Sequence, residues 1–256
     1  MCIRDRFDLV VGADGVHSAV RRLAFGPEEQ LVESLGYCYA VADAAAPLDG
    51  LETRRPDGRA VAYGYNEPGR LALLGGQKAP SLFVFRAPGG GAPYDRHDAA
   101  SQRAFLEAAF AGAGWRVPAA LDAVRRADDL YLDALARTRM TSFTRGRFAL
   151  VGDSGHANTL GGFGTGLSLV AAYVLAGELV AARGDHETAF AAYDRRMRKP
   201  TRVARTGNAG PFLAPPTNAR IRMRDRTFTT RWMYRSMLWM TDVFATDANV
   251  PAYALR

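Results

Sequence analysis

Lysine, histidine and cysteine are all scarce in this chain of 256 residues. Lys78 and Lys199 are the two lysines, so arginine supplies nearly all of the positive charge behind the formal net charge of +7. The two cysteines are too few for a disulfide framework, and neither they nor the four scattered histidines show metal-ligand spacing. These absences exclude a disulfide-stapled fold, and we expect no metal site.

Long uncharged apolar runs and targeting patterns are also missing. Met1–Val11 has no sustained apolar core of the kind a signal peptide needs. The most apolar stretch, Ser168–Ala182, is too short to cross a bilayer and contains Glu178. Arginines cluster at 195–205 and 220–235 without an aromatic stacking platform or a helix-turn-helix pattern. We therefore expect a cytoplasmic protein without stable membrane insertion or nucleic-acid partner, and the sequence leaves its oligomeric state open.

The most informative stretch that is present is Arg147–Gly166, which reads RFALVGDSGHANTLGGFGTG. Its apolar run Phe148–Val151 predicts a buried strand that ends on Gly152 and Asp153. A glycine-rich loop then leads into an alanine- and leucine-rich helix expected over Thr165–Ala182. Without Cβ atoms, the loop glycines let the backbone lie against a planar ligand and adopt positive φ angles.

The same stretch offers two kinds of polar group to a ligand. The first turn of the Thr165 helix has unpaired N–H groups and the positive end of the helix dipole, which favour negative charge. The Asp153 carboxylate at the end of the strand accepts hydrogen bonds from hydroxyl groups and repels phosphate. These properties suit a flavin with a polyol chain.

A second motif near the N-terminus completes a resemblance. Residues 8–22 read DLVVGADGVHSAVRR and resemble the DG motif of the FAD-dependent aromatic-ring monooxygenases, the para-hydroxybenzoate hydroxylase-like flavoproteins. The matching residues there are Asp14, Gly15, Ser18 and Arg21. The later stretch is similar to the GD motif of that family, GDxxHxxxPxxGxGxN, through Gly152, Asp153, His156, Gly162 and Gly164. The departures are a missing proline near Leu160, a loop about one residue short, and Gly166 where asparagine is common.

The resemblance covers nearly the whole chain, with Gly114-Trp115 similar as well, but one family element is absent. The family begins with a strand, a GxGxxG turn and a helix that bind the ADP half of FAD. The sequence opens instead on the strand before the DG motif. We therefore expect a C-terminal fragment of a longer enzyme, with a complete short protein as the alternative. Whether Met1–Arg6 are native stays open.

The resemblance implies an α/β fold with three parts. Residues 1–30 and 145–200 form an incomplete, Rossmann-like FAD-binding domain. An inserted mixed β-sheet substrate domain occupies 31–144, and C-terminal helices occupy 201–256.

The local patterns predict particular elements within these parts. Strands are expected at 36–41, 60–65, 71–74 and 82–85, after a first strand and helix over 7–25 with Ser18 as N-cap. Helices are expected over 98–113 and continuously from 165 to 198. A proline-broken stretch at 211–216 precedes a last helix, 218–244. That helix places Ile221, Phe228, Trp232, Trp239 and Val243 on one apolar face, part of which we expect to be uncovered in this chain.

The resemblance also implies the chemistry. We expect a monooxygenase that uses FAD, takes electrons from NADPH or NADH, and hydroxylates an aromatic or polyketide-like small molecule with dioxygen through a C4a-hydroperoxyflavin. The residues expected to bind the cofactor are Asp14, Gly15, Arg21, Gly152, Asp153, Gly162, Gly164, Thr165 and Gly166. The catalytic residues stay unassigned.

Several of these assignments have alternatives. Asp14-Gly15 also suits a plain strand-to-helix turn, and Arg21 is either a surface arginine on a helix or a residue that contacts FAD or the adjoining loop. His156 is expected to make a structural hydrogen bond rather than act as a general base. The chain alone is expected to be inactive. The alternative functions are another flavin enzyme of the same architecture, such as a halogenase or reductase, and a non-catalytic fragment or degenerate relative.

Overall fold

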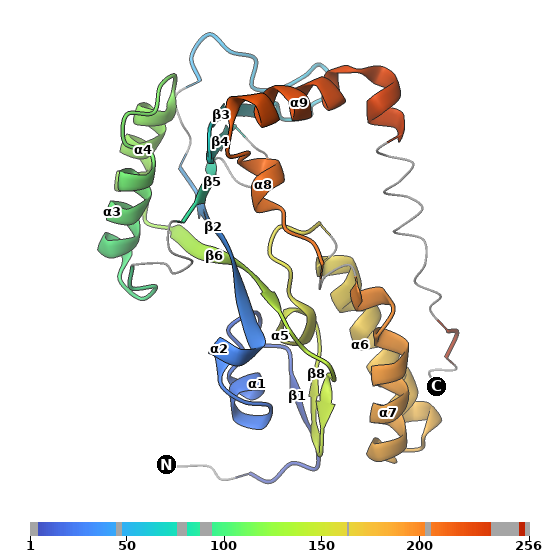
Figure 1. The fold of residues 1–256 in the computed structure, drawn as a ribbon. Coiled ribbons are helices and arrows are strands. Elements are labelled where there is room, and N and C mark those ends of the chain that lie inside the picture. The colour runs from blue at the N-terminus through green and yellow to red at the C-terminus, as the bar shows by residue number, and fades with distance from the viewer. Residues whose placement is uncertain are drawn as a thin grey trace. The chain divides into compact units, whose positions relative to one another are not determined.

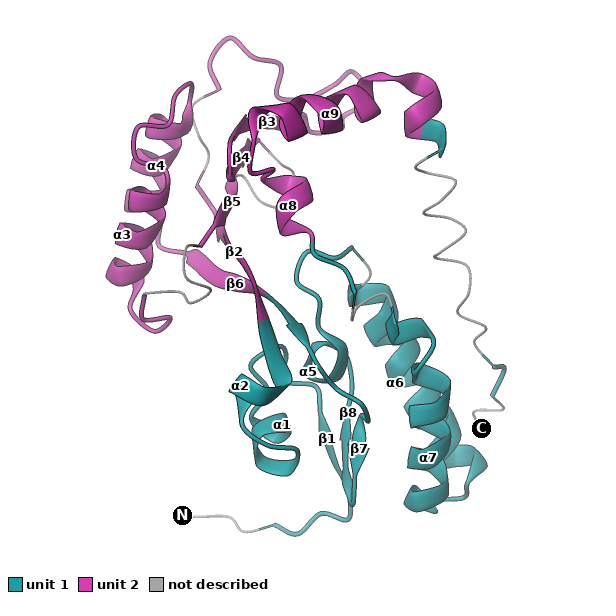
Figure 2. Ribbon diagram, viewed as in Figure 1, with its two compact units in different colours: residues 1–33, 136–208, 235–256 teal, residues 34–135, 209–234 magenta. Residues whose placement is uncertain are grey.

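The computed structural model describes residues 5–44, 48–75, 81–87, 94–162, 164–202, 206–236 and 251–253 (Figure 1). The chain divides into two compact units (Figure 2). Unit 1 contains residues 1–33, 136–208 and 235–256, and unit 2 contains residues 34–135 and 209–234. The C-terminal segment expected at 201–256 is shared between the two units.

Unit 1 is built on a three-stranded sheet in the order β1-β8-β7. Strand β1 (Val10–Gly12) pairs in parallel with β8 (Phe148–Leu150), while β7 (Thr144–Arg145) is antiparallel to β8. Because β1 and β8 are parallel, the two glycine-containing loops that follow them leave from the same edge of the sheet. Segments more than 130 residues apart in the sequence are thereby brought together.

Helix α1 (Ala19–Ala24) packs closely on this sheet, and the expected strand and helix over 7–25 are confirmed. Ser18 is the N-cap, as predicted, and its side chain accepts a hydrogen bond from the Arg21 N–H at 2.9 Å. Gly12 allows the close approach, because a Cβ there would lie 2.9 Å from side-chain atoms of Leu150 and Val20.

Helices α5 (Asp153–His156), α6 (Gly164–Ala181) and α7 (His186–Met197) follow β8 in the chain. The continuous helix expected from 165 to 198 is wrong, because Arg183 and Gly184 adopt φ angles of 52° and 87° and end α6. A short helix α2 (Glu28–Leu31) and a 3₁₀ turn at Pro200–Arg202 complete this part of unit 1. The unit's core joins β8, α6 and α7 through Leu150, Ala149, Val174, Leu175, Phe190, Tyr193 and Met197.

Among the described helices, α6 is long and apolar enough to cross a membrane by length and composition alone. The core helix of a soluble protein passes the same test, so this is weak evidence. Near its end, Glu178 is buried and forms an ion pair with Arg196 of α7. The absence of membrane insertion stays a prediction.

Unit 2 is centred on a five-stranded sheet in the order β3-β4-β5-β2-β6. Its strands are β2 (Val32–Ala42), β3 (Tyr63–Glu67), β4 (Arg70–Leu74), β5 (Ser81–Arg86) and β6 (Leu130–Thr138). Strands β2, β4 and β5 contain the expected strands at 36–41, 71–74 and 82–85. The strand expected at 60–65 begins only at Tyr63. The ladders of β3 with β4, β4 with β5, and β2 with β5 are antiparallel.

One face of this sheet carries α3 (Ala99–Ala109) and α4 (Val117–Arg126) (Figure 1). Asp98 caps α3, which ends earlier than the predicted 98–113. The sequence analysis missed α4. The core on this face includes Phe83, Phe85, Leu106, Phe110, Val117 and Val124.

The other face of the sheet carries α8 (Gly210–Leu213) and a smaller apolar cluster. The break expected at 211–216 is partly wrong, because Pro211 occupies the first turn of α8, where proline is tolerated. Helix α9 (Asn218–Thr229) ends well before the predicted 244, and a further helical stretch covers 231–236. Phe228 and Trp232 are exposed, whereas Trp239 and Val243 lie outside the described residues.

Candidate functional site

Both sequence motifs lie at the carboxyl-terminal edge of the parallel strands β1 and β8 in unit 1. Ligands of α/β sheets bind outside this edge, where loops and helix N-termini converge. We call residues 13–18 the first loop and residues 151–166 the second loop. Each loop contains residues that the sequence analysis selected, but the acidic residues of the two loops have different surroundings.

The first loop uses its acidic residue to hold its own structure. The Asp14 carboxylate accepts hydrogen bonds from the Ser18 hydroxyl at 2.5 Å and from the N–H groups of Ala19 and Val20 at 2.7 and 3.1 Å. Burial opposes ionisation, but these donors outweigh it and lower the pKa of Asp14. Gly15 adopts a φ of 79°, which side-chain-bearing residues disfavour. Asp14 and Gly15 therefore form the strand-to-helix turn that precedes α1.

Arg21 connects the two loops. Its side chain is fully buried, and its guanidinium donates to the carbonyl oxygen of Ser154 in the second loop at 2.8 Å and to that of Val16 in the first. Glu28 lies 3.8 Å away and partly balances the charge. Of the two roles the sequence left open, the structure gives Arg21 contact with the adjoining loops.

Ser154 is a buried residue that the sequence analysis did not select. Its hydroxyl lies 2.6 Å from the Gly12 carbonyl oxygen at the end of β1 and 2.8 Å from that of Val151. It therefore ties β1 to the second loop beside the Arg21 bridge. A small polar residue directly after Asp153 is the one sequence signal for this role.

Asp153, by contrast, has no hydrogen bond to its carboxylate within the described part of the chain. The side chain reaches solvent, yet nearby protein atoms desolvate it enough to raise its pKa. One carboxylate oxygen lies 3.6 Å from the position that a Cβ on Gly164 would occupy. The carboxylate thus stands beside the N-terminus of α6, available to a ligand that donates hydrogen bonds.

The glycines of the second loop keep the space around Asp153 open. Gly152 has a φ of 69°, and a Cβ there would lie 3.0 Å from the Ser168 hydroxyl. Gly162 has a φ of 85°, and among the described residues no atom beyond its chain neighbours lies within 4 Å of its Cβ position; the same holds for Gly166 beyond the backbone of its own helix. Thr165 and Gly166 are exposed in the first turn of α6. Backbone N–H groups of this turn are therefore accessible to an anionic or polar ligand edge.

The loop departs from regular geometry where the family's proline is missing. Leu160 adopts a φ of 57°, a region that a bulky side chain occupies only under strain. Its side chain is 37% exposed, so packing does not account for its identity. The strained residue lies directly before Gly161 and Gly162.

His156 is a buried residue of the second loop. Its imidazole is 2% exposed and stands edge-on to the Phe143 ring at 5.8 Å. Neither ring nitrogen has a hydrogen-bond partner among the described residues, so the structural hydrogen bond expected for this side chain is not found there. Burial lowers the pKa of His156 to about 4, and the ring is neutral at pH 7.

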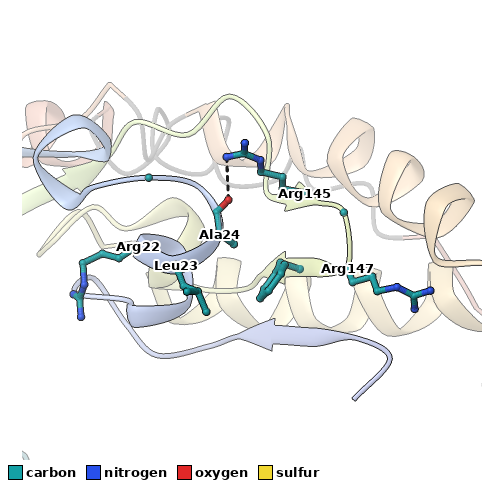
Figure 3. Close-up of a pocket in the computed structure, with 8 residues that line it drawn as sticks. Arg22, Leu23, Ala24, Arg145 and Arg147 are labelled. Atoms are coloured by element: carbon teal, nitrogen blue, oxygen red, sulfur yellow. Dashed lines mark hydrogen bonds between the residues drawn. The ribbon is translucent and has the colours of Figure 1, made fainter. Parts of the chain in front are cut away.

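A separate pocket of about 460 Å³ lies at the other end of β8 (Figure 3). It contains no residue of either loop. The guanidinium groups of Arg22, Arg145 and Arg147 point in different directions, and that of Arg145 donates to the Ala24 carbonyl at 3.0 Å. These arginines hold chain segments rather than converge on a ligand.

Four tyrosines on β2 and β3 of unit 2 divide between two surroundings. Tyr37 is buried against Gly210 of α8, and Tyr39 lies in the same apolar cluster. Tyr63 and Tyr65 instead contact the Trp115 ring, at centroid distances of 6.4 and 6.0 Å.

No family model matches the chain. Comparisons with individual proteins find similarity to flavin- and FAD-dependent monooxygenases. Over 200 residues it is 37% identical to a flavin-dependent monooxygenase of an unknown prokaryotic organism, covering 76% of this chain and 49% of the relative. It is 34% identical over 191 residues to the FAD-dependent monooxygenase asL4 of Sarocladium schorii, covering 71% and 43% of the two chains. The crystal structure of tetracycline destructase Tet(51) matches with a TM-score of 0.76 and 27% identity, over 96% of this chain and 63% of that one. The chain spans about half the length of the curated relatives it matches.

Proposed function

We propose that this chain forms part of a FAD-dependent monooxygenase and holds FAD against the second loop of unit 1. The proposal follows because the chain is homologous to such enzymes and has their fold. The observation that carries the proposal is the Asp153 carboxylate, which has no hydrogen-bond partner among the described residues and stands beside the exposed first turn of α6.

The residues of the second loop fit this cofactor. Asp153 accepts hydrogen bonds from the hydroxyls of the ribityl chain. The open spaces at Gly162 and Gly166 admit a planar ring system, and the exposed first turn of α6 at Gly164 and Thr165 stabilises negative charge on its edge. In other settings such a helix terminus contributes roughly 0.3–2 kcal/mol.

The first loop contributes support. Asp14 and Gly15 shape the turn before α1, and Arg21 holds that turn against the second loop. Because the Asp14 carboxylate already accepts three hydrogen bonds, we assign the loop's contact with FAD to its backbone.

The finer chemistry is part of the same proposal. When bound, FAD reduced by NADPH or NADH supplies oxygen activation as a C4a-hydroperoxyflavin, and the substrate is an aromatic or polyketide-like small molecule. The chain contributes position and electrostatics and supplies no covalent nucleophile. We also propose that the enzyme is cytoplasmic and has neither a metal nor nucleic acid as a partner.

FAD titration tests the proposal. We define the extended protein as this chain preceded by the strand–GxGxxG–helix segment that the resemblance leads us to expect. It should purify with non-covalent FAD, oxidise NADPH or NADH and consume dioxygen, while the chain alone should bind FAD weakly. Tight, stoichiometric FAD binding by the chain alone would contradict this division of roles. A colourless extended protein with no FAD affinity would contradict the function itself.

A further inference from the structure

Helix α9 of unit 2 is held against its own unit through Arg224. The Arg224 guanidinium donates to the carbonyl oxygens of Phe212 and Leu213 at 3.2 and 3.0 Å. It also donates to the amide oxygen of Asn66 at 2.7 Å, which fixes α9 beside the edge strand β3 (Figure 1). The side of the helix that carries Arg224 therefore faces the unit, and the opposite side is left at the surface.

Two arginines on that surface side have no counter-charge. Arg222 and Arg226 are exposed, and among the described residues neither guanidinium forms a hydrogen bond or an ion pair. They lie four residues apart on the helix, so their like charges face each other and destabilise it. Residues 209–234 contain five arginines and one acidic residue, Asp225, whose carboxylate is paired with Arg224 at 2.7 Å. A negatively charged partner would relieve this repulsion.

Large apolar side chains are exposed beside these arginines. Met223 is 66% exposed on α9, and Trp232 in the helical stretch that follows is 70% exposed. The Phe228 ring contacts those of Phe212 and Tyr234 at centroid distances of 5.8 and 6.3 Å, and all three side chains are exposed as well. Exposed apolar side chains that gather in this way mark a surface that binds a partner.

We propose that the outer face of α9 (Arg222, Met223 and Arg226), together with Trp232, binds the surface of a bilayer that contains anionic phospholipid. Guanidinium groups bind phosphate through charge-assisted hydrogen bonds. Methionine and tryptophan side chains enter the boundary between headgroups and acyl chains. An anionic bilayer accepts both kinds of side chain, whereas a nucleic acid offers phosphate without an apolar phase for Met223. The contact is peripheral and needs no helix that crosses the membrane.

Vesicle flotation tests the proposal. This chain would be mixed with vesicles of phosphatidylcholine alone, or of phosphatidylcholine and phosphatidylglycerol in equal parts, and floated through a density gradient. Each arginine near an anionic surface strengthens binding about fivefold, so the two on the outer face should give the anionic vesicles a preference of at least about twentyfold. Higher ionic strength should weaken the binding to the anionic vesicles.

Two variants separate the charged from the apolar contribution. Arg222→Gln/Arg226→Gln should lose most of the preference for anionic vesicles, while its weak binding to phosphatidylcholine stays the same. Trp232→Ser should bind the anionic vesicles about fivefold more weakly, because less apolar surface leaves water.

Arg55→Gln/Arg126→Gln provides the matched control, because it removes the same net charge. Arg55 precedes β3 and Arg126 ends α4, and both are exposed without a side-chain hydrogen bond or ion pair among the described residues. This variant should bind like the wild type, and circular dichroism would establish that each variant is folded.

Four results would overturn the proposal. They are a wild type with no preference for anionic vesicles, equal losses in the two double-arginine variants, a Trp232→Ser variant that binds like the wild type, and a chain that binds a single-stranded oligonucleotide but neither kind of vesicle. The last result would assign the outer face of α9 to nucleic acid.

Discussion

The two glycine-containing loops of unit 1 leave from the same edge of neighbouring parallel strands but are built in opposite ways. In the first loop the acidic residue, Asp14, accepts three hydrogen bonds from its own turn and helix. In the second, Asp153 has no described partner, and Leu160 holds a strained φ of 57°. Arg21 and Ser154 join the two loops below the surface.

The difference shows how similar motifs take different roles. A carboxylate satisfied by its own backbone stabilises local structure and has little left for a ligand. A carboxylate that reaches solvent and has no hydrogen-bond partner among the described residues stays available to a ligand that supplies the donors. We therefore propose that the first loop is the support and that the second is the binding surface.

Breaking the connection between the loops should have the largest effect. Arg21→Met removes the donors of two carbonyl oxygens, at roughly 1–3 kcal/mol each, so the free energy of unfolding should fall on the order of 4 kcal/mol. Urea denaturation measures it. The neighbouring Arg22→Met is the control. Because the Arg22 guanidinium is exposed, its loss should lower the free energy of unfolding by less than about 1 kcal/mol. Equal losses in the two variants would refute a bridging role for Arg21.

Acidification should lower the stability of the folded chain through protonation of His156. The folded-state pKa of about 4 lies below the ordinary 6.5, so between these values only the unfolded chain binds the proton. Stability should therefore be unaffected above pH 6.5 and fall by about 3 kcal/mol as the pH drops towards 4. Urea unfolding at several pH values measures the loss. His156→Leu should be less sensitive to pH across this window, and an unchanged slope would show that the imidazole titrates normally.

Relieving the strain in the second loop should have a small effect of the opposite sign. Leu160→Gly removes a left-handed conformation that costs about 1–2 kcal/mol and adds a glycine entropy cost of about 0.5–1 kcal/mol. We expect a net stabilisation of about 0.5–1 kcal/mol by urea denaturation. Leu160→Ala shortens the side chain but keeps the conformation, so it should bring no gain. A gain shared by both variants would point to the side chain instead of the backbone.

Periodicity predicted most of the elements that surround these loops. Alternating apolar residues identified β2, β4 and β5, and the Ser18 cap identified the start of α1. Helix α4 was missed, although Val117, Ala120, Leu121 and Val124 have helical spacing and are all buried. Pro118 in its first turn was compatible with a helix start.

The connection between the loops could not be predicted in the same way. Arg21 had two open roles because its partner, the Ser154 carbonyl, is 133 residues away in the sequence. Backbone acceptors carry no residue identity, so no pattern marks them. The break of α6 at Gly184 had a signal in that glycine, but the positive φ of Arg183 depends on the packed turn.

The most direct test of the contrast between the loops is a paired measurement on Asp14→Ala and Asp153→Ala in the extended protein. For each variant, urea denaturation of the FAD-free protein gives stability, and fluorescence titration gives FAD affinity. Asp14→Ala should cost about 1–2 kcal/mol of stability, as lost helix caps do, and leave FAD affinity nearly unchanged. Asp153→Ala should keep stability within about 0.5 kcal/mol and weaken FAD binding by about 1–3 kcal/mol. The reverse pattern, with Asp14 governing affinity and Asp153 governing stability, would contradict the assignment of support and binding surface.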